Sequence, residues 1–218
     1  IRGSLALFDY ENAGFHIDIE NLVAAGRGTA FKNLGKVNSQ GVEVRTDFLL
    51  SKMSKLLPNL GVAYTYLSTE VLDGAILSNI QPVGTEVSIN GKELPYSPDH
   101  TLNVGLELNP VRNLFFRLDY KYVSKVYTDF QNLEDEDDRV GYNLGISGPI
   151  PEYSLINLSS SYQFSQKMKL FLSGKNITDE VYIGSRLHSN PGQKDANISS
   201  GILPGARRQI NLGIEYTF

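Results

Sequence analysis

The sequence contains no cysteine and no tryptophan, and none of its apolar runs is long. A membrane-spanning helix needs about 20 consecutive apolar residues, so the sequence offers no candidate for one. Without cysteine the chain cannot carry disulfide frameworks, thiolate metal sites or cysteine nucleophiles. The formal net charge of −4 gives no broad basic surface, and we therefore expect no nucleic-acid partner.

The composition is that of a polar chain with many aromatic residues. The 218 residues are 41% hydrophobic and include 12 Tyr and 10 Phe, and the mean hydropathy is −0.20. Low mean hydropathy does not exclude a membrane β-barrel, because the interior and the loops of such barrels are polar. Tyr and Phe would then supply the aromatic rings at the membrane surfaces.

The last eight residues give the first specific indication of a fold. Their apolar set is Leu212, Ile214, Tyr216 and Phe218, and their polar set is Asn211, Gly213, Glu215 and Thr217. Alternation with a period of two places each set on its own face of a β-strand. A soluble sandwich could show the same alternation. A strand that ends the sequence on an aromatic residue is more typical of the closing strand of a membrane β-barrel.

About eight segments of this alternating kind follow one another along the chain. We predict strands at residues 3–20, 36–51, 59–71, 99–108, 113–127, 153–164, 167–177 and 207–218. Short turns are predicted at 52–58, 109–112 and 165–166, and long loops at 21–35, 72–98, 128–152 and 178–206. Outer-membrane barrels have this asymmetry, with short periplasmic turns and long extracellular loops.

The alternation also predicts which face of each strand is apolar. In the fifth strand the outward set is Leu114, Phe116, Leu118, Tyr120 and Tyr122, and the inward set is Phe115, Arg117, Asp119 and Lys121. Charges on the inner face can pair across strands and contact water. In the first strand the alternation slips, so we predict a bulge or break near residues 12–14.

Four stretches of the sequence are distinctive: Gly41-Val42-Glu43, Leu94-Pro95-Tyr96-Ser97-Pro98-Asp99-His100, Gly174-Lys175-Asn176-Ile177-Thr178-Asp179-Glu180-Val181-Tyr182 and Leu203-Pro204-Gly205-Ala206-Arg207-Arg208. In their sequence, order and spacing they resemble the C-terminal barrel of TonB-dependent outer-membrane receptors. The resemblance implies a barrel of twenty-two strands around an N-terminal plug. It also implies uptake of ferric siderophores, haem or cobalamin, powered through TonB.

Within that family, one run resembles the ferric dicitrate and related siderophore receptors most. It extends from Leu94-Pro95-Tyr96 through Tyr122-Val123-Ser124 to Ile150-Pro151-Glu152-Tyr153. The last strand resembles the signal by which the barrel-assembly machinery recognises its clients. That resemblance places Asn211, Gly213, Tyr216 and Phe218 at the patterned positions of the signal.

The chain departs from the family in length. It begins at Ile1 without an initiator methionine, a signal peptide, a plug or a TonB box, so we expect a mature or excised portion of a protein. The fold expected for residues 1–218 is all-β, an antiparallel transmembrane β-barrel whose eight strands form an arc of the larger barrel. Small inward residues such as Gly61, Ala63 and Thr65 suit a wide wall, whereas a closed barrel of eight strands is filled by its side chains. Contact with the TonB complex would then require the N-terminal region.

A few polar residues are candidates for ligand contact. Arg186, His188 and Asn190, together with Lys194, lie in the last long loop and could bind an anionic ferric chelate through charge-assisted hydrogen bonds. The alternative for each is an ordinary solvated loop residue. The acidic run at residues 134–138 is interpreted as a solvated loop, since it lacks the pattern of a calcium loop.

The sequence predicts neither a cofactor nor an enzyme. His16, His100 and His188 have no partner at a metal-ligand spacing, so no metal site is expected. Ser159-Ser160-Ser161 lacks the glycine-framed elbow of a nucleophilic serine.

Three hypotheses follow for the function of the chain. The first is the wall and loops of a receptor for a ferric chelate in the outer membrane of a Gram-negative bacterium, in contact with outer-membrane lipid. The second is a small self-contained barrel that acts as an adhesin or structural protein. The third is an outer-membrane hydrolase. Pairing of residues 3–20 with 207–218 would favour the second hypothesis.

Overall fold

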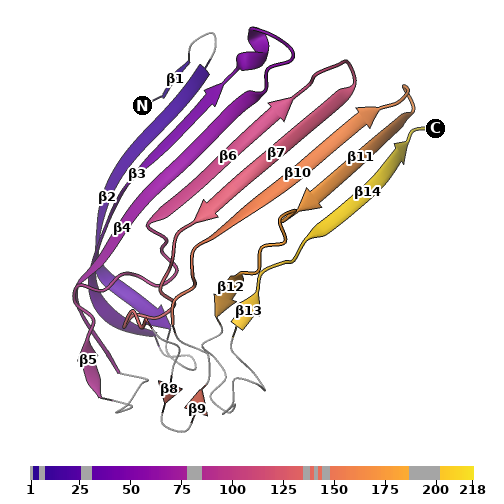
Figure 1. Cartoon of the computed structure of the whole chain (residues 1–218). Coiled ribbons are helices and arrows are strands. Elements are labelled where there is room, and N and C mark those ends of the chain that lie inside the picture. Colours follow the sequence, from indigo (N-terminus) through magenta and orange to yellow (C-terminus); the bar gives the residue numbers. More distant parts are fainter. Residues whose placement is uncertain are drawn as a thin grey trace.

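One antiparallel sheet dominates the chain (Figure 1). The computed structural model describes residues 2–4, 8–25, 31–77, 85–134, 138–139, 142–143, 148–186 and 202–218. The sheet runs in the order β1 (Arg2–Ser4), β2 (Phe8–Ala25), β3 (Phe31–Phe48), β4 (Asn59–Leu77), β6 (His100–Leu108), β7 (Leu114–Val123), β10 (Tyr153–Gln163), β11 (Met168–Lys175) and β14 (Gln209–Tyr216). The all-β, antiparallel fold and the eight long strands are therefore confirmed. No described helix is long and apolar enough to cross a membrane.

The two ends of the sheet differ as predicted. Short connections join β3 to β4, β6 to β7 and β10 to β11 at one end, and the first of them carries a 3-10 helix, η1 (Leu50–Lys52). Long connections lie at the opposite end, in the lower part of Figure 1. They carry five short strands: β5 (Glu86–Ser88), β8 (Asp138–Arg139), β9 (Tyr142–Asn143), β12 (Ile183–Arg186) and β13 (Ile202–Pro204). β5 pairs with β4, and the other four form two separate hairpins.

The first two long strands depart from the prediction. The first segment is not one strand, since β1 turns back and pairs with Asp9–Glu11 of β2. The bulge predicted near residues 12–14 is wrong, because that part of β2 pairs with β3 in an unbroken register. Continuous backbone pairing with β3 keeps this part regular where the side-chain pattern alone suggested a break.

The predicted loop at 21–35 is mostly strand. β2 continues to Ala25 and β3 starts at Phe31, with register shifts between Ile19 and Val23. A shift of register exchanges the two faces of a strand, and this exchange hides the alternation from which a strand is recognised in the sequence.

Register confirms that the two faces of the sheet differ in polarity. One row across five strands is Phe48, Leu60, Leu106, Leu118 and Leu158, and the adjacent row on the other face is Asp47, Gly61, Gly105, Asp119 and Asn157. Residues that pair across antiparallel strands lie on the same face. The apolar and charged sets predicted for single strands therefore join into continuous faces.

In the part of the chain that the structure describes, no second layer of protein covers the apolar face. Leu118, Leu158 and Leu106 are half-buried by their lateral neighbours, and Ile214 on the edge strand β14 is exposed. Among the described side chains, the buried hydrophobic cluster is Val37, Val71 and Ile89, where a long loop folds over the charged face. Soluble domains bury an apolar sheet face against another layer. A bare apolar face of this extent fits contact with lipid instead.

We predict that Leu118→Arg obstructs insertion into the membrane. An arginine on the lipid-facing side costs about 2–4 kcal/mol near the bilayer midplane. The matched control is Ser159→Arg, because Ser159 adjoins Leu158, the partner of Leu118, and lies on the charged face at the same depth. Arg117→Ala should also be mild. Heat-modifiability gels of outer-membrane fractions measure the folded amount, and equal tolerance at positions 118 and 159 would contradict the face assignment.

Candidate functional site

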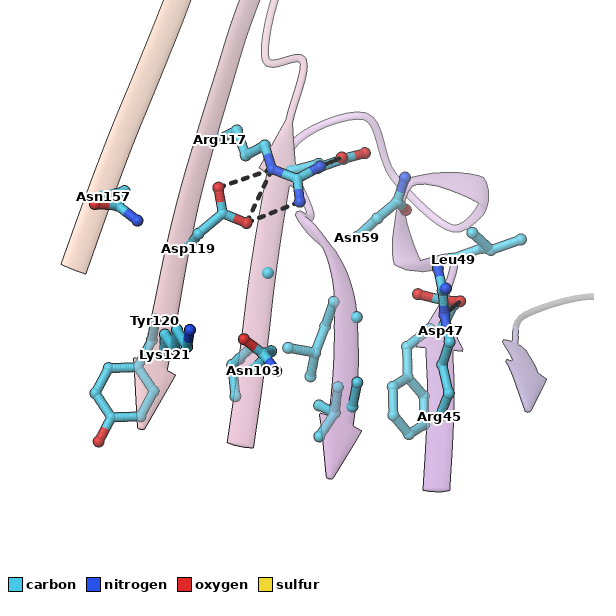
Figure 2. A pocket seen from close by; sticks show the side chains of 18 residues that line it. Arg45, Asp47, Leu49, Asn59, Asn103, Arg117, Asp119, Tyr120, Lys121 and Asn157 are labelled. Carbon is cyan, nitrogen blue, oxygen red and sulfur yellow. Dashed lines mark hydrogen bonds and ion pairs between the residues drawn. The ribbon is translucent and has the colours of Figure 1, made fainter. Parts of the chain in front are cut away.

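The charged face carries a hollow near the end with the short connections (Figure 2). The hollow has a volume of about 540 Å³ and is lined by residues of β3, β4, β6, β7 and β10. Glycines give its charged side chains room. A Cβ atom at Gly61 would lie 2.7 Å from Asp47 Oδ1, and one at Gly105 would lie 3.4 Å from Asp119 Oδ1. In this row the two glycines pair with each other, and a charged residue lies on the strand beyond each of them.

Arg117 is the centre of the ion pairs in this hollow. Its Nε lies 2.9 Å from both carboxylate oxygens of Asp119, and its Nη1 donates to Glu107 on the neighbouring strand β6. The predicted pairing of inward charges across strands is confirmed here. All three side chains are partly exposed, so water screens the attraction and its contribution to stability is small. The charged side chains of the hollow are thus open to solvent. The described residues contain no group of three metal-ligating side chains.

Arg186, a predicted ligand contact, ties three outer loops together. Its backbone oxygen accepts a hydrogen bond of 2.8 Å from the hydroxyl of Tyr96, and its Nη2 donates to the carbonyl of Pro149 at 3.2 Å. The residue is 5% exposed. His188 and Asn190 lie outside the described residues. A role for Arg186 in ligand binding stays a prediction, and the structure adds a role in fixing the loops.

The loop after β7 is held by contacts of its own and is also linked to the loop before β6. Lys125 Nζ lies 3.1 Å from both carboxylate oxygens of Glu134, and the Tyr127 hydroxyl donates to the same carboxylate. Hydrogen bonds from Tyr127 and Lys125 lower the pKa of Glu134. Asn132 and Glu93 bond reciprocally, with the Asn132 side chain accepting from Glu93 N at 2.7 Å and donating to Glu93 O at 3.0 Å. Sequence reasoning did not identify these links.

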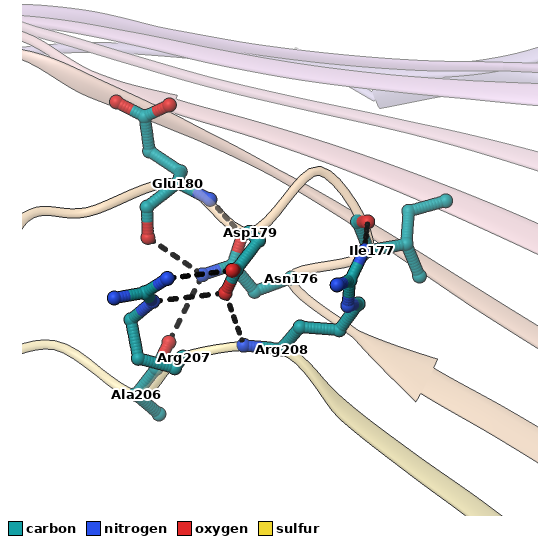
Figure 3. A network of polar contacts seen from close by, with 7 residues as sticks. All are labelled: Asn176, Ile177, Asp179, Glu180, Ala206, Arg207 and Arg208. Atoms are coloured by element: carbon teal, nitrogen blue, oxygen red, sulfur yellow. Dashed lines mark hydrogen bonds and ion pairs between the residues drawn. The ribbon is translucent and has the colours of Figure 1, made fainter.

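Asp179 joins the two most distinctive sequence motifs (Figure 3). Its Oδ1 accepts from Arg207 Nε at 2.9 Å and from the backbone N of Arg208 at 3.0 Å, and its Oδ2 accepts from Arg207 Nη2 at 2.6 Å. These bonds hold the pKa of the Asp179 carboxyl well below its usual range, with the Arg207 side chain as the largest cause. The contact connects the segment after β11 to the segment before β14.

Asn176 completes the same junction from inside. It has a positive φ of 48° and is buried. Its Nδ2 donates to the carbonyls of Glu180 at 2.9 Å and Ala206 at 3.0 Å, and its Oδ1 accepts from Glu180 N at 2.9 Å. An amide has two donors and an acceptor, so one buried side chain satisfies three backbone groups here.

Gly205 in the second motif gives space to an aromatic ring. A Cβ there would lie 2.1 Å from Tyr182 Cζ, and Tyr182 stacks on Tyr153 with 4.5 Å between ring centroids. A side chain larger than hydrogen at position 205 would displace this stack.

The four residues predicted as an assembly signal lie on or just after β14. Asn211 pairs with Ser173 and Gly213 with Phe171, while Tyr216 contacts the ring of Phe218 at 5.2 Å, edge to face. A Cβ at Gly213 would lie 2.1 Å from Phe171 Cζ, so the Phe171 ring lies across the glycine. Phe218 is fully exposed. Whether an assembly machinery binds these residues stays a prediction.

The chain matches the family model of the TonB dependent receptor-like β-barrel over residues 4–177. It belongs to the TonB-dependent receptor family. Receptors of this family are transporters and not enzymes, in agreement with the expectation that the chain carries no catalytic site. No curated protein sequence matches the chain.

Solved structures show the same fold at low sequence identity. The chain is 18% identical to the siderophore receptor PiuA from Acinetobacter baumannii, with 96% of this chain and 26% of that one covered and a TM-score of 0.69. The ferric citrate transporter FecA is 21% identical, with coverages of 98% and 29% and a TM-score of 0.73. The copper transporter OprC is 13% identical, with coverages of 100% and 30% and a TM-score of 0.65. The chain therefore spans less than a third of the length of these receptors.

We predict that Gly213→Ala destabilises the edge of the sheet, because its methyl group would meet the Phe171 ring. Overpacking of this kind costs about 1–3 kcal/mol. Phe171→Ala in the same background should restore the midpoint of urea unfolding in lipid vesicles and the assembled amount. If Gly213→Ala is equally harmful with and without the Phe171 ring, position 213 acts as a recognition signal alone.

We predict that Asp179→Asn weakens the junction of β11 and β14 at neutral pH and has less effect in acid. The folded pKa of Asp179 lies below its unfolded value, so its stabilisation is present above the unfolded pKa of about 3.9 and is lost as pH falls from there towards the folded pKa. Urea unfolding of the natural and Asn variants at neutral and acid pH measures the difference. A difference independent of pH would contradict this role of the carboxylate. Glu215→Gln, on β14 outside the junction, is the control.

Proposed function

We propose that the chain forms part of the barrel wall and the extracellular loops of an outer-membrane receptor that takes up a ferric chelate in a Gram-negative bacterium. The observation that carries the proposal is the match to the receptor barrel family together with a sheet that is apolar on one face and charged on the other. The chelate would be a siderophore or a ferric dicitrate-like complex. The likeness to receptors whose names specify siderophore and ferric citrate supports this class.

Transport of this kind requires binding and passage without bond chemistry at the wall. The long loops would capture the chelate, and the hydrated charged face would line the conduit. Energy would come through TonB, contacted by an N-terminal region of the receptor. Assembly would begin with recognition of β14 by the barrel-assembly machinery. The likeness to a copper transporter means that the fold alone does not choose the cargo.

The runner-up hypothesis is a small self-contained barrel, and it requires the first strand to pair with the last. In the described residues β14 pairs with β11 only, and β2 pairs with β1 and β3. The first and last long strands therefore do not close on each other, and the open, curved sheet fits an arc of a wider wall.

Uptake of radiolabelled iron tests the proposal. Deleting the gene should abolish uptake of one class of ferric chelate, and deleting TonB should do the same. Ferric dicitrate, ferric hydroxamates, ferric catecholates and a copper complex should be compared. If no ferric chelate depends on the gene while copper uptake or surface adhesion does, the proposal is wrong.

The loop candidates give a finer prediction. His188→Ala with Asn190→Ala should weaken chelate binding by about tenfold, because each lost hydrogen bond contributes about 0.5–1.5 kcal/mol. Arg186→Ala is a poorer test, since that side chain also holds Pro149. Gln166→Ala, in a short connection at the opposite end, is the matched control. Binding of the chelate to whole cells measures the effect. Equal affinity in the natural protein, the double variant and the Gln166→Ala control would mean that His188 and Asn190 do not contact the chelate.

A further inference from the structure

The connection between β3 and β4 differs in composition from the other short connections. Residues 49–58 hold four Leu, one Met and two Lys with no acidic residue. Met53 is 66% exposed and Leu56 is 72% exposed. Large apolar side chains on a water-facing turn are unfavourable unless something covers them.

The connection between β3 and β4 is held in a defined conformation by its own hydrogen bonds. Within η1 and the turn after it, Met53 N donates to Leu50 O at 3.0 Å and Leu57 N donates to Ser54 O at 3.0 Å. Ser51 N donates to the side chain of Asn59 at 3.0 Å. These bonds pair N–H groups of the connection, which lowers the cost of moving it into a less polar medium.

Most of the connection lies outside the hollow on the charged face. The lining of the charged hollow stops at Leu49 and Asn59, so residues 50–58 do not contribute to it. On the other side, Leu60 at the start of β4 belongs to the apolar face and pairs with Leu106. The exposed rings of Phe164 and Phe218 lie at the same end of the sheet. Aromatic rings in such positions are typical of a membrane surface.

We propose that residues 49–58 form an interfacial anchor that docks onto anionic phospholipid in the leaflet at this end of the barrel. Met53 and Leu56 enter the boundary between head groups and acyl chains, and Lys52 and Lys55 lie at the phosphates. Surface helices bind membranes with the same combination of apolar and basic side chains. The proposal rests on the proposed function only in that the wall must lie in a membrane.

A single labelled cysteine tests the anchor. Residues 1–218 contain no cysteine, and any cysteine elsewhere in the natural protein is replaced by serine. Leu56→Cys can then carry an environment-sensitive fluorophore in the protein at its full natural length, reconstituted in phosphatidylcholine vesicles with and without phosphatidylglycerol. Gln166→Cys, an exposed polar position at the same end, is the matched control. Leu118→Cys reports on the wall itself. Heat-modifiability confirms that each protein is folded.

The expected result is quenching at position 56 by lipids labelled near the head group, stronger with phosphatidylglycerol, and little quenching at position 166. Lys52→Gln with Lys55→Gln should lose most of the dependence on phosphatidylglycerol. A probe at 56 that is as open to aqueous iodide as the probe at 166 would overturn the proposal. So would a probe shielded from both iodide and lipid quenchers, which would mean that protein covers the turn. If position 118 is quenched by lipid and 56 is not, the anchor alone fails; if neither is quenched, the membrane assignment fails too.

Discussion

The whole structure depends on one constraint. Alternate residues of a single sheet must suit two different surroundings, lipid on one face and water on the other. Hydrogen bonds between neighbouring strands pair their backbone N–H and C=O groups, so the strands can lie in lipid without leaving these groups unsatisfied. The apolar face therefore needs no second layer of protein if lipid covers it. The row through Leu106, Leu118 and Leu158 forms that face, and the row through Gly105, Asp119 and Asn157 forms its opposite. Few of the described side chains are buried within protein, because one face of the sheet is suited to lipid and the other to water.

The rest of the chain elaborates the two ends of this wall. At one end, long loops fold over the charged face and are tied together by contacts such as Tyr96 with Arg186 and Glu93 with Asn132. Between β11 and β14, Asp179 and Asn176 fix two segments that the pairing of β12 with β13 also brings together. Such side-chain contacts position the loops, and positioned loops are what a receptor needs for selective capture.

The sequence predicted the long strands because their alternation is regular. The strands β6, β7, β10, β11 and β14 agree with the prediction within four residues, whereas β4 continues to Leu77, six residues beyond its predicted end. It failed at residues 12–14, where the alternation is interrupted but the pairing is not, and in the extended ends of β2 and β3, where the register itself shifts. The resemblance to a family identified the motifs around Asn176 and Arg207 without saying why they occur. Their contact joins residues 28 to 30 positions apart, and no local pattern specifies such a pair. His188 and Asn190 remain predictions, since they lie outside the described residues.

The central claim is that the apolar face meets lipid and the charged face meets water. Spin labels placed one at a time along residues 114–123 of β7 test it most directly, by their accessibility to oxygen, which partitions into lipid, and to a nickel chelate, which stays in water. The account predicts a period of two, with oxygen preferred at Leu114, Phe116, Leu118 and Tyr120 and nickel preferred at Arg117, Asp119 and Lys121. Equal accessibility along the strand, or nickel preferred at Leu118, would contradict it.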